Sequence, residues 1–324
     1  MAEIVNGFDA SVVDRKARVA PSGIDIAYQR FGRADAPPVL LIMGVGGQSI
    51  NWPDAFCATL VEHGLQTIRF DNRDAGLSSR MPPVGSLATK VMMARALFGL
   101  PVRPPYTLDD MARDTVGLMD ALGIGQAHVV GASMGGMIAQ IIAIEHPERV
   151  KSLTSIMSTS GDRALPGPKG EVRRALLRPR PRDKAMAVRR YMEMFRLIGG
   201  AGYPPAEDEL RARVERAVRR SYRPDGFGRQ MIAIQTAPSR VLKLRGVRAP
   251  TLVLHGSHDP LVPLAGGEDT AANIPGARLR IVPGMGHFLP EALIPLLVDE
   301  IARHCLDAED AGRSKVRRAA GGPP

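Results

Sequence analysis

The chain has 324 residues, 44% of them hydrophobic, which is enough for one large domain with a substantial core. Its two cysteines, Cys57 and Cys305, are too few and too far apart for a disulfide framework or a zinc site, so we expect a reducing, cytoplasmic compartment. The first ten residues lack the features of a signal peptide, and the longest apolar run, residues 129–144, contains Ser133 and Gln140. That run is typical of a strand, a turn and a buried helix rather than of a membrane span.

The positive charge of the chain is concentrated in one segment. The formal net charge is +10, and residues 160–245 hold 21 Lys or Arg against nine Asp or Glu, so the rest is near neutral. Such a segment can contact nucleic acid, an anionic membrane surface or an acidic ligand, or it can be a solvated Arg-rich face. Because no helix-turn-helix spacing, zinc finger or aromatic-interleaved basic motif is present, we expect no nucleic-acid partner. A weak contact with an anionic membrane surface stays open.

Short apolar runs alternate with helical patterns along most of the chain. We expect strands at residues 37–44, 65–71, 127–131, 150–157, 251–256 and 277–284. We expect helices from Trp52 to Gly64, from Thr107 to Gly123 and from Met134 to His146. This alternation predicts an α/β fold with a mostly parallel sheet and helices on both faces. The runs near residues 17–31 add a possible antiparallel edge, and residues 1–17 and 307–324 are expected to be flexible tails.

The alternation breaks once, between residues 160 and 245. This part begins with Pro and Arg clusters and continues with amphipathic helical patterns, so it predicts a helical, Arg-rich cap. The cap separates the two parts of the core, residues 18–159 and 246–306. A second apolar segment, residues 89–100, carries two cations, and it can pack on the body, line an acyl pocket or contact lipid.

The stretch Gly131-Ala-Ser133-Met-Gly135 has the G-x-S-x-G form of a nucleophile elbow, with a strand before it and a helix after it. The tight turn is expected to hold Ser133 in a strained backbone conformation at a helix N-terminus, where N–H groups favour developing negative charge. Gly131 and Gly135 are expected because a Cβ there would collide with the turn or a neighbouring strand. Ser133 is therefore the candidate nucleophile.

A serine nucleophile needs a base, and the base needs an orienting carboxylate. Asp259 lies just past the expected strand at 251–256, and His287 lies past the strand at 277–284. The chain order Ser, Asp, His is that of α/β-hydrolases. His258 is the alternative base and Asp162 the alternative acid. No metal or organic cofactor is expected.

The donors that stabilise an oxyanion should come from two loops. One is the backbone N–H of Met134, directly after the nucleophile, and the other lies in the loop after the strand at 37–44. That loop reads Met-Gly-Val-Gly-Gly, and the N–H of Val45 is our choice. Gly46 and Gly47 allow a substrate to approach the backbone, although they can also serve only to turn the chain.

Together these motifs resemble the α/β-hydrolase superfamily over about residues 20–305. Within it the pattern is most similar to LipG-type carboxylesterases and lipases, and less closely to anthracycline methylesterases. The resemblance implies a Ser-His-Asp hydrolase without cofactor. The chain departs from the common pattern at Met43, where many relatives have His, and at Asp74, where many have Gly. Asp71 and Arg73 in the same turn are expected to tie loops together.

The substrate pocket is expected between the sheet edge and the cap. Candidate lining residues are large apolar side chains of the cap, which at helical spacing can equally be plain core: Met186, Tyr191, Met194, Phe195, Tyr222, Phe227 and Met231. Because Met adapts to varied shapes, we expect apolar acyl esters of short to medium length. The alternatives are an acyl-CoA thioesterase, a lipid-surface lipase and a ligand receptor that retains the triad. The small-molecule ester or thioester is the only partner that the sequence indicates, and the oligomeric state stays open.

Overall fold

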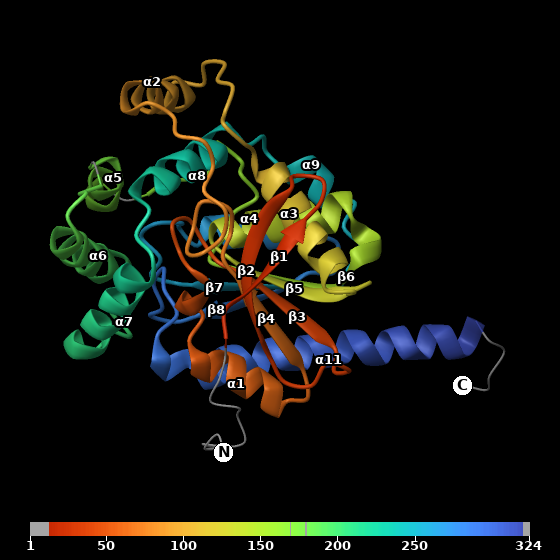
Figure 1. Cartoon of the computed structure of the whole chain (residues 1–324). Helices are drawn as coiled ribbons and strands as arrows, with labels where there is room; N and C mark the ends of the chain where they lie inside the picture. The colour runs from red at the N-terminus through yellow and green to blue at the C-terminus, as the bar shows by residue number, and fades with distance from the viewer. Residues whose placement is uncertain (1–12, 169, 179, 320–324) are drawn as a thin grey trace.

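The computed structural model describes residues 13–168, 170–178 and 180–319 of the chain. Within these ranges eight strands form one sheet in the order β1-β2-β4-β3-β5-β6-β7-β8 (Figure 1). Both the β1/β2 and the β2/β4 pairs are antiparallel, which confirms the edge predicted near residues 17–31, and all other pairs are parallel. The strands are β1 (Arg15–Val19), β2 (Ile24–Phe31), β3 (Pro38–Ile42), β4 (Gln66–Phe70), β5 (Ala127–Ala132), β6 (Val150–Ile156), β7 (Thr251–Gly256) and β8 (Arg278–Val282).

Helices cover both faces of this sheet, as the alternating pattern predicts. One face packs against α3 and α4, and the other against α1 and the long C-terminal helix α11 (Figure 1). The α-helices are α1 (Asp54–Glu62), α2 (Ser86–Leu97), α3 (Leu108–Ala121), α4 (Met134–Glu145), α5 (Gly170–Leu177), α6 (Lys184–Ile198), α7 (Glu207–Arg220), α8 (Pro224–Thr236), α9 (Val241–Leu244), α10 (Ala265–Asn273) and α11 (Ile294–Ala319).

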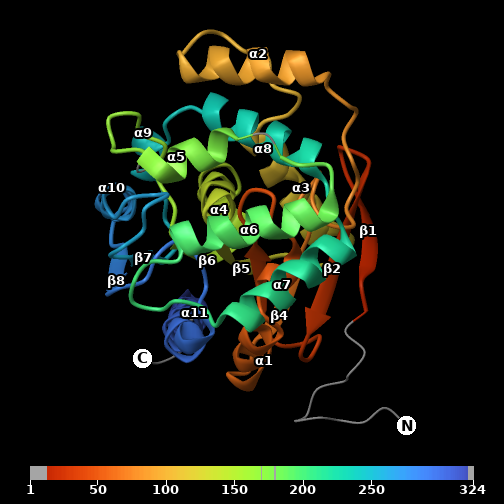
Figure 2. The ribbon, with the colours of Figure 1, turned by 90° about the vertical axis from the view of Figure 1, so that its left-hand side faces the viewer.

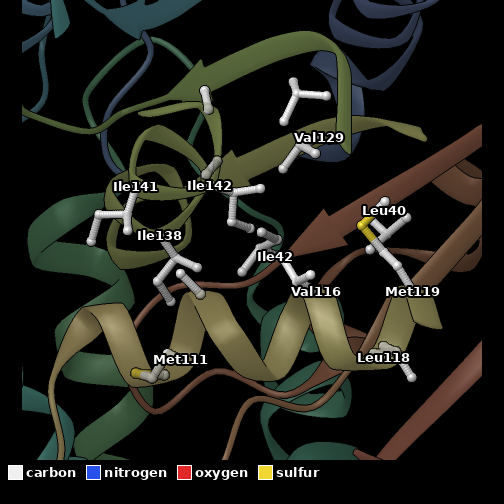
Figure 3. Packing of buried hydrophobic residues seen from close by; sticks show 14 of the residues in the cluster. Leu40, Ile42, Met111, Val116, Leu118, Met119, Val129, Ile138, Ile141 and Ile142 are labelled. Carbon is white, nitrogen blue, oxygen red and sulfur yellow. The ribbon is translucent and has the colours of Figure 1, made fainter. Parts of the chain in front are cut away.

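The central strand β3 shows why its apolar run is continuous. Successive side chains of a strand point to opposite faces. Leu40 and Ile42 therefore pack with α3 and α4 (Figure 3), whereas Val39 and Leu41 pack with α1 and α11. Because both faces are covered, every position of the strand is apolar.

The cap predicted at residues 160–245 is helical. Helices α5, α6 and α7 lie together on one side of the molecule, and α2 lies above them (Figure 2). From Ala233 onward the segment packs into the core, since Ala233, Leu244 and Val247 belong to the cluster under α3 and α4. Only the first part of α8 therefore faces the cap.

Many cap arginines are interior, which limits the solvated-face interpretation of the basic segment. Arg229 forms a buried ion pair with Asp74, and Arg220 forms one with Asp71. Arg213 donates to the backbone carbonyl of Asn51 at 2.7 Å. These bonds join the cap to loops of the core, so part of the positive charge has a structural role.

The two expected tails differ from the structure where they are described. β1 begins at Arg15 because residues 15–19 pair with β2. At the other end α11 continues to Ala319 rather than ending near residue 306. Glu309 on this extension accepts hydrogen bonds from Lys151 and His128. These bonds hold the beginning of the extension against the sheet. Residues 1–12 and 320–324 lie outside the described part.

None of the helices in the described ranges combines the length and apolar character needed to cross a membrane.

Candidate active site

Ser133 lies in the strained turn that the sequence predicts. It precedes the first residue of α4 and has φ 57° and ψ −120°, a left-handed φ that is rare outside Gly. A Cβ on Gly131 would lie 2.1 Å from the carbonyl oxygen of Gly135, and one on Gly135 would lie 2.0 Å from that of Ile42. Both glycines are therefore required by close backbone approach, and the hydroxyl stands clear of the sheet.

Asp259 and His287 meet at the ends of neighbouring strands. Nδ1 of His287 lies 2.6 Å from Oδ2 of Asp259, and both side chains are buried. The other carboxylate oxygen accepts the N–H groups of Leu261 at 2.9 Å and Val262 at 2.8 Å. Because an ionised carboxylate only accepts, Nδ1 carries the proton and Nε2 is left as the basic nitrogen.

Ser133 and His287 line the same cavity, which has a volume of about 180 Å³. The hydroxyl of Ser133 is partly accessible, and it has no hydrogen-bond partner among the described residues. The structure therefore brings the three predicted residues to one site, with a hydrogen bond between Asp259 and His287 and none between His287 and Ser133. Catalytic hydrogen bonds of this kind commonly tighten when substrate binds.

The loop that carries His287 is attached to the cap. Its backbone N–H donates to the carbonyl of Ile198, the last residue of α6, at 2.6 Å. A Cβ on Gly286 would lie 2.3 Å from the same carbonyl oxygen, so the loop and the end of α6 are in close contact. The position of the imidazole thus depends on the cap as well as on Asp259.

The loop after β3 passes directly beside Ser133. A Cβ on Gly44 would lie 3.5 Å from Oγ of Ser133. The N–H of Gly46 is occupied, because it donates to Oε1 of Gln230 at 2.7 Å. The N–H groups of Val45 and Met134 take part in none of the loop and turn hydrogen bonds of the described chain. They are the two predicted donors, and both residues lie next to Ser133 or in the loop beside it.

Of the seven predicted pocket residues, four line the cavity and three do not. Tyr191, Met194, Phe195 and Phe227 form part of its wall. Met186 was expected there, but it lies in the first turn of α6 and is 48% exposed.

Met231 and Tyr222 are also absent from the wall. Met231 lies one turn beyond Phe227 along α8, past the cavity. Tyr222 instead donates its hydroxyl to the carbonyl of Pro181. In this structure Met186, Met231 and Tyr222 therefore do not line the cavity.

Several wall residues were not singled out from the sequence: Leu176, Arg180, Ile198, Arg213, Phe288 and Leu289. Ile198 continues the helical spacing of Met194 and Phe195, and Phe288 directly follows His287, so both had a usable signal. Arg180 and Arg213 had none, because each lies in an Arg-rich stretch that is typical of solvent-exposed surface.

The alternative acid and base lie elsewhere. His258 is exposed and bonds to neighbouring Ser257, and Asp162 accepts the N–H of Ala164 in its own loop. His255 is buried, with Nε2 at 2.8 Å from the carbonyl of Val262, and burial lowers its pKa. No group of three His, Cys, Asp or Glu side chains in the described ranges could hold a metal ion.

The segment at residues 89–100 packs on helix α8 and does not line the cavity. It forms most of α2, which lies against α8 (Figure 2), and none of its residues lines the pocket. Leu87 and Phe98, at the two ends of α2, are 73% and 78% exposed. None of the three roles predicted for this segment is thereby established, and contact with lipid is taken up below.

Comparison with known proteins agrees with this architecture. Residues 37–291 match the family described as the alpha/beta hydrolase fold. The chain is 32% identical over 291 residues to the rhodomycin D methylesterase DauP of Streptomyces sp. (strain C5), covering 84% of this chain and 91% of that protein. It is also 32% identical over 292 residues to the rhodomycin D methylesterase DnrP of Streptomyces peucetius, with the same coverage of 84% and 91%.

A solved structure shows the same fold. The enol-lactonase from Burkholderia xenovorans LB400 superposes with a TM-score of 0.68 at 23% identity, covering 91% of this chain and 100% of that one. The family match spans most of the chain, and the relatives above cover more than two thirds of it. The chain therefore belongs to the α/β-hydrolase family and is a hydrolase.

Proposed function

We propose that this protein is a serine carboxylic-ester hydrolase that works through an acyl-enzyme on Ser133. The observation that most supports this is the 2.6 Å bond between His287 and Asp259 at a cavity that also contains Ser133. A buried carboxylate that orients a neutral imidazole toward an accessible serine is the arrangement that activates a hydroxyl nucleophile.

The proposed cycle has two acyl-transfer steps. Oγ of Ser133 attacks the ester carbonyl while Nε2 of His287 takes its proton. The N–H groups of Val45 and Met134 stabilise the oxyanion, a contribution worth about 10²–10³-fold in kcat for each donor. The imidazolium then protonates the leaving alcohol. A water molecule, activated by the same imidazole, hydrolyses the acyl-enzyme and restores the serine.

The wall of the cavity supports apolar acyl esters of short to medium length. Most of it is apolar, including Met194, Phe195, Ile198 and Leu289. The two relatives at 32% identity are named methylesterases, which supports a small alcohol such as methanol as the leaving group. Thioesters of the same acids would follow the same steps.

The nucleophile is tested by labelling with a fluorophosphonate and mapping the modified peptide. We expect the label on Ser133 and its loss in Ser133→Ala. The matched control is Ser221→Ala, because Ser221 lines the same cavity but donates its hydroxyl to the carbonyl of Gly76. A label on Ser221, or labelling that persists in Ser133→Ala, would contradict the proposal.

The substrate class is tested with 4-nitrophenyl esters and methyl esters of increasing acyl length. We expect kcat/KM to rise and then fall as the acyl chain fills and outgrows the cavity. Ser133→Ala should lower kcat by about 10⁴–10⁶-fold. Absence of turnover across both series would refute ester hydrolysis.

A lipid-surface hydrolase is a second candidate, and α2 is the observation that favours it. Its exposed apolar side chains include Leu87, Val91 and Phe98, and it carries Lys90 and Arg95. Such a helix can lie on an anionic membrane surface. Sedimentation with phosphatidylglycerol vesicles tests this, and a Leu87→Ser/Phe98→Ser variant should lose binding. If the wild type does not sediment, this candidate is excluded.

A further inference from the structure

Arg180 has an unusual environment at the cavity. It lines the pocket between the sheet and the cap, and it forms no hydrogen bond or ion pair with any described residue. Its guanidinium lies over the ring of Phe227, 3.7 Å from the centroid, and 5.2 Å from that of Tyr191. Burial lowers the pKa of Arg180, so its positive charge is desolvated without a counter-ion.

Two other cap arginines near the cavity have carboxylate partners. Arg229 pairs with Asp74 through two bonds of 2.7 Å, and Arg220 pairs with Asp71 at 2.8 Å. The carboxylate of Asp74, which also lines the cavity, is therefore already neutralised. A buried charge without a partner is costly, and two aromatic faces compensate only part of that cost.

Arg213 adds to the positive charge of the same wall. Its guanidinium donates only to backbone carbonyls, those of Asn51 at 2.7 Å and Leu289 at 3.3 Å. Burial lowers the pKa of Arg213 to about 10, and none of the ion pairs among the described residues includes it. The cavity wall is thus largely apolar, but the described residues give no carboxylate partner to three of its guanidinium groups: those of Arg180, Arg213 and Arg223, the last of which donates to the backbone carbonyl of Ser78.

We propose that Arg180 determines specificity by binding a carboxylate carried by the substrate, so that the preferred substrates are esters with a free carboxylate elsewhere in the molecule. This rests on the proposed ester hydrolysis at Ser133. Stacking on Phe227 and Tyr191 uses the face of the guanidinium and leaves its N–H donors free in the plane, where they match the two oxygens of a carboxylate. One such anion on an otherwise apolar molecule fits the composition of the wall.

The test compares two ester substrates that differ in one charge. The anionic ester is the mono-4-nitrophenyl ester of a dicarboxylic acid, adipic or longer, and the neutral ester is the same compound with its free carboxyl as a primary amide. We expect wild-type kcat/KM to be at least about tenfold higher for the anionic ester, as for other hydrogen bonds to charged groups. The readout is the ratio of the two kcat/KM values, because general effects on catalysis cancel in it.

Arg180→Gln should lower this ratio by about tenfold or more, chiefly through KM of the anionic ester. Arg180→Lys should restore part of it, because the charge is kept and the two-pronged geometry is lost. The matched control is Arg178→Gln, which removes the same charge from an exposed position two residues away and should keep the wild-type ratio.

A wild-type ratio near one, or an unchanged ratio in Arg180→Gln, would overturn the inference while leaving ester hydrolysis intact. If Arg180→Gln does not fold, the wild-type ratio and inhibition by adipamic acid against adipamide decide the question alone. Turnover of neither ester by a folded wild type would instead refute the proposed function. In that case the anion site would still be supported if the wild type binds adipamic acid but not adipamide and Arg180→Gln loses this preference.

Discussion

The carboxylate of Asp74 and the guanidinium of Arg229 form a buried ion pair with two bonds of 2.7 Å, which joins the loop after β4 to helix α8. The hydroxyl of Tyr106 and the N–H of Met81 donate to the same carboxylate, each at 2.9 Å. Asp74 has a left-handed φ of 67°, a conformation that favours Gly. Asp74 therefore has a strained backbone, and its side chain anchors the cap through Arg229.

Arg229→Gln should lower the free energy of unfolding by about 3–5 kcal/mol, because it leaves the Asp74 carboxylate buried without its counter-ion. Urea unfolding followed by circular dichroism measures this. The matched control is Arg219→Gln on α7, whose partner Glu215 is on the surface, and it should change stability by less than about 0.5 kcal/mol. Equal effects of the two substitutions would show that the buried ion pair stabilises the fold no more than the surface pair does.

Asp259→Asn should lower kcat on a 4-nitrophenyl ester by about 10⁴-fold with little change in fold, because the amide no longer fixes the productive tautomer of His287. Steady-state kinetics measures this, with circular dichroism as the check on folding. Asp162→Asn is the matched control, since Asp162 was the alternative acid and bonds only within its own loop. If the large loss follows Asp162→Asn instead, the assignment of the acid is wrong.

Gly286→Ala should lower kcat by about 10²-fold, because the new Cβ would lie 2.3 Å from the carbonyl carbon of Gly199 and displace the loop that carries His287. Gly125→Ala is the control, since a Cβ there meets no atom within 4 Å. Kinetics on the purified variants gives the comparison. Wild-type turnover by Gly286→Ala would mean that the loop and α6 can move apart without lowering kcat.

Stability should fall below about pH 6.5, and His128 should account for part of the fall. Its pKa is lowered by burial, against the opposing effect of Glu309, which lies 3.1 Å away. A His with a lowered pKa in the folded state binds its proton more readily once unfolded, so its contribution is complete above about pH 6.5 and is lost as the pH drops toward the folded pKa.

His128→Gln should therefore reduce the slope of unfolding free energy against pH between pH 6.5 and 5 by up to ~1.4 kcal/mol per pH unit. Urea unfolding at a series of pH values measures the slope. His258→Gln serves as the control because that side chain is exposed, and its slope should match the wild type. A wild-type slope in His128→Gln would exclude His128 as a source of the acid sensitivity.

Much of the fold could be predicted because the strands of the parallel part are short runs, some apolar throughout and some alternating between apolar and polar residues, that recur between helical patterns. The six expected strands coincide with observed ones, with ends that agree within two residues. The elbow was equally predictable, since Gly131 and Gly135 are dictated by backbone contacts that no other residue permits. Asp259 and His287 could be chosen because the carboxyl ends of neighbouring parallel strands meet.

The rest depended on tertiary packing that local sequence does not encode. The packing of Ala233 into the core depends on which face of α8 meets the core. The extension of α11 is held by a hydrogen bond from Lys151, distant in sequence, to Glu309. Arg180 and Arg213 look like surface residues in sequence, and only the fold reveals that they border the cavity. Met186 failed for the opposite reason, because helical spacing does not show where along α6 the pocket ends.

The 2.6 Å bond from the His287 backbone to Ile198 has a consequence for engineering this scaffold. Grafting a cap from another hydrolase would replace the acceptor at the end of α6 and the glycines packed beside it. In a chimera that exchanges residues 160–232 alone, the imidazole of His287 should therefore be misaligned. A chimera that also takes residues 283–288 from the donor would keep the end of α6 matched to the loop that carries His287. Recombination between relatives should therefore give active enzymes most often when residues 160–232 and residues 283–288 come from the same parent.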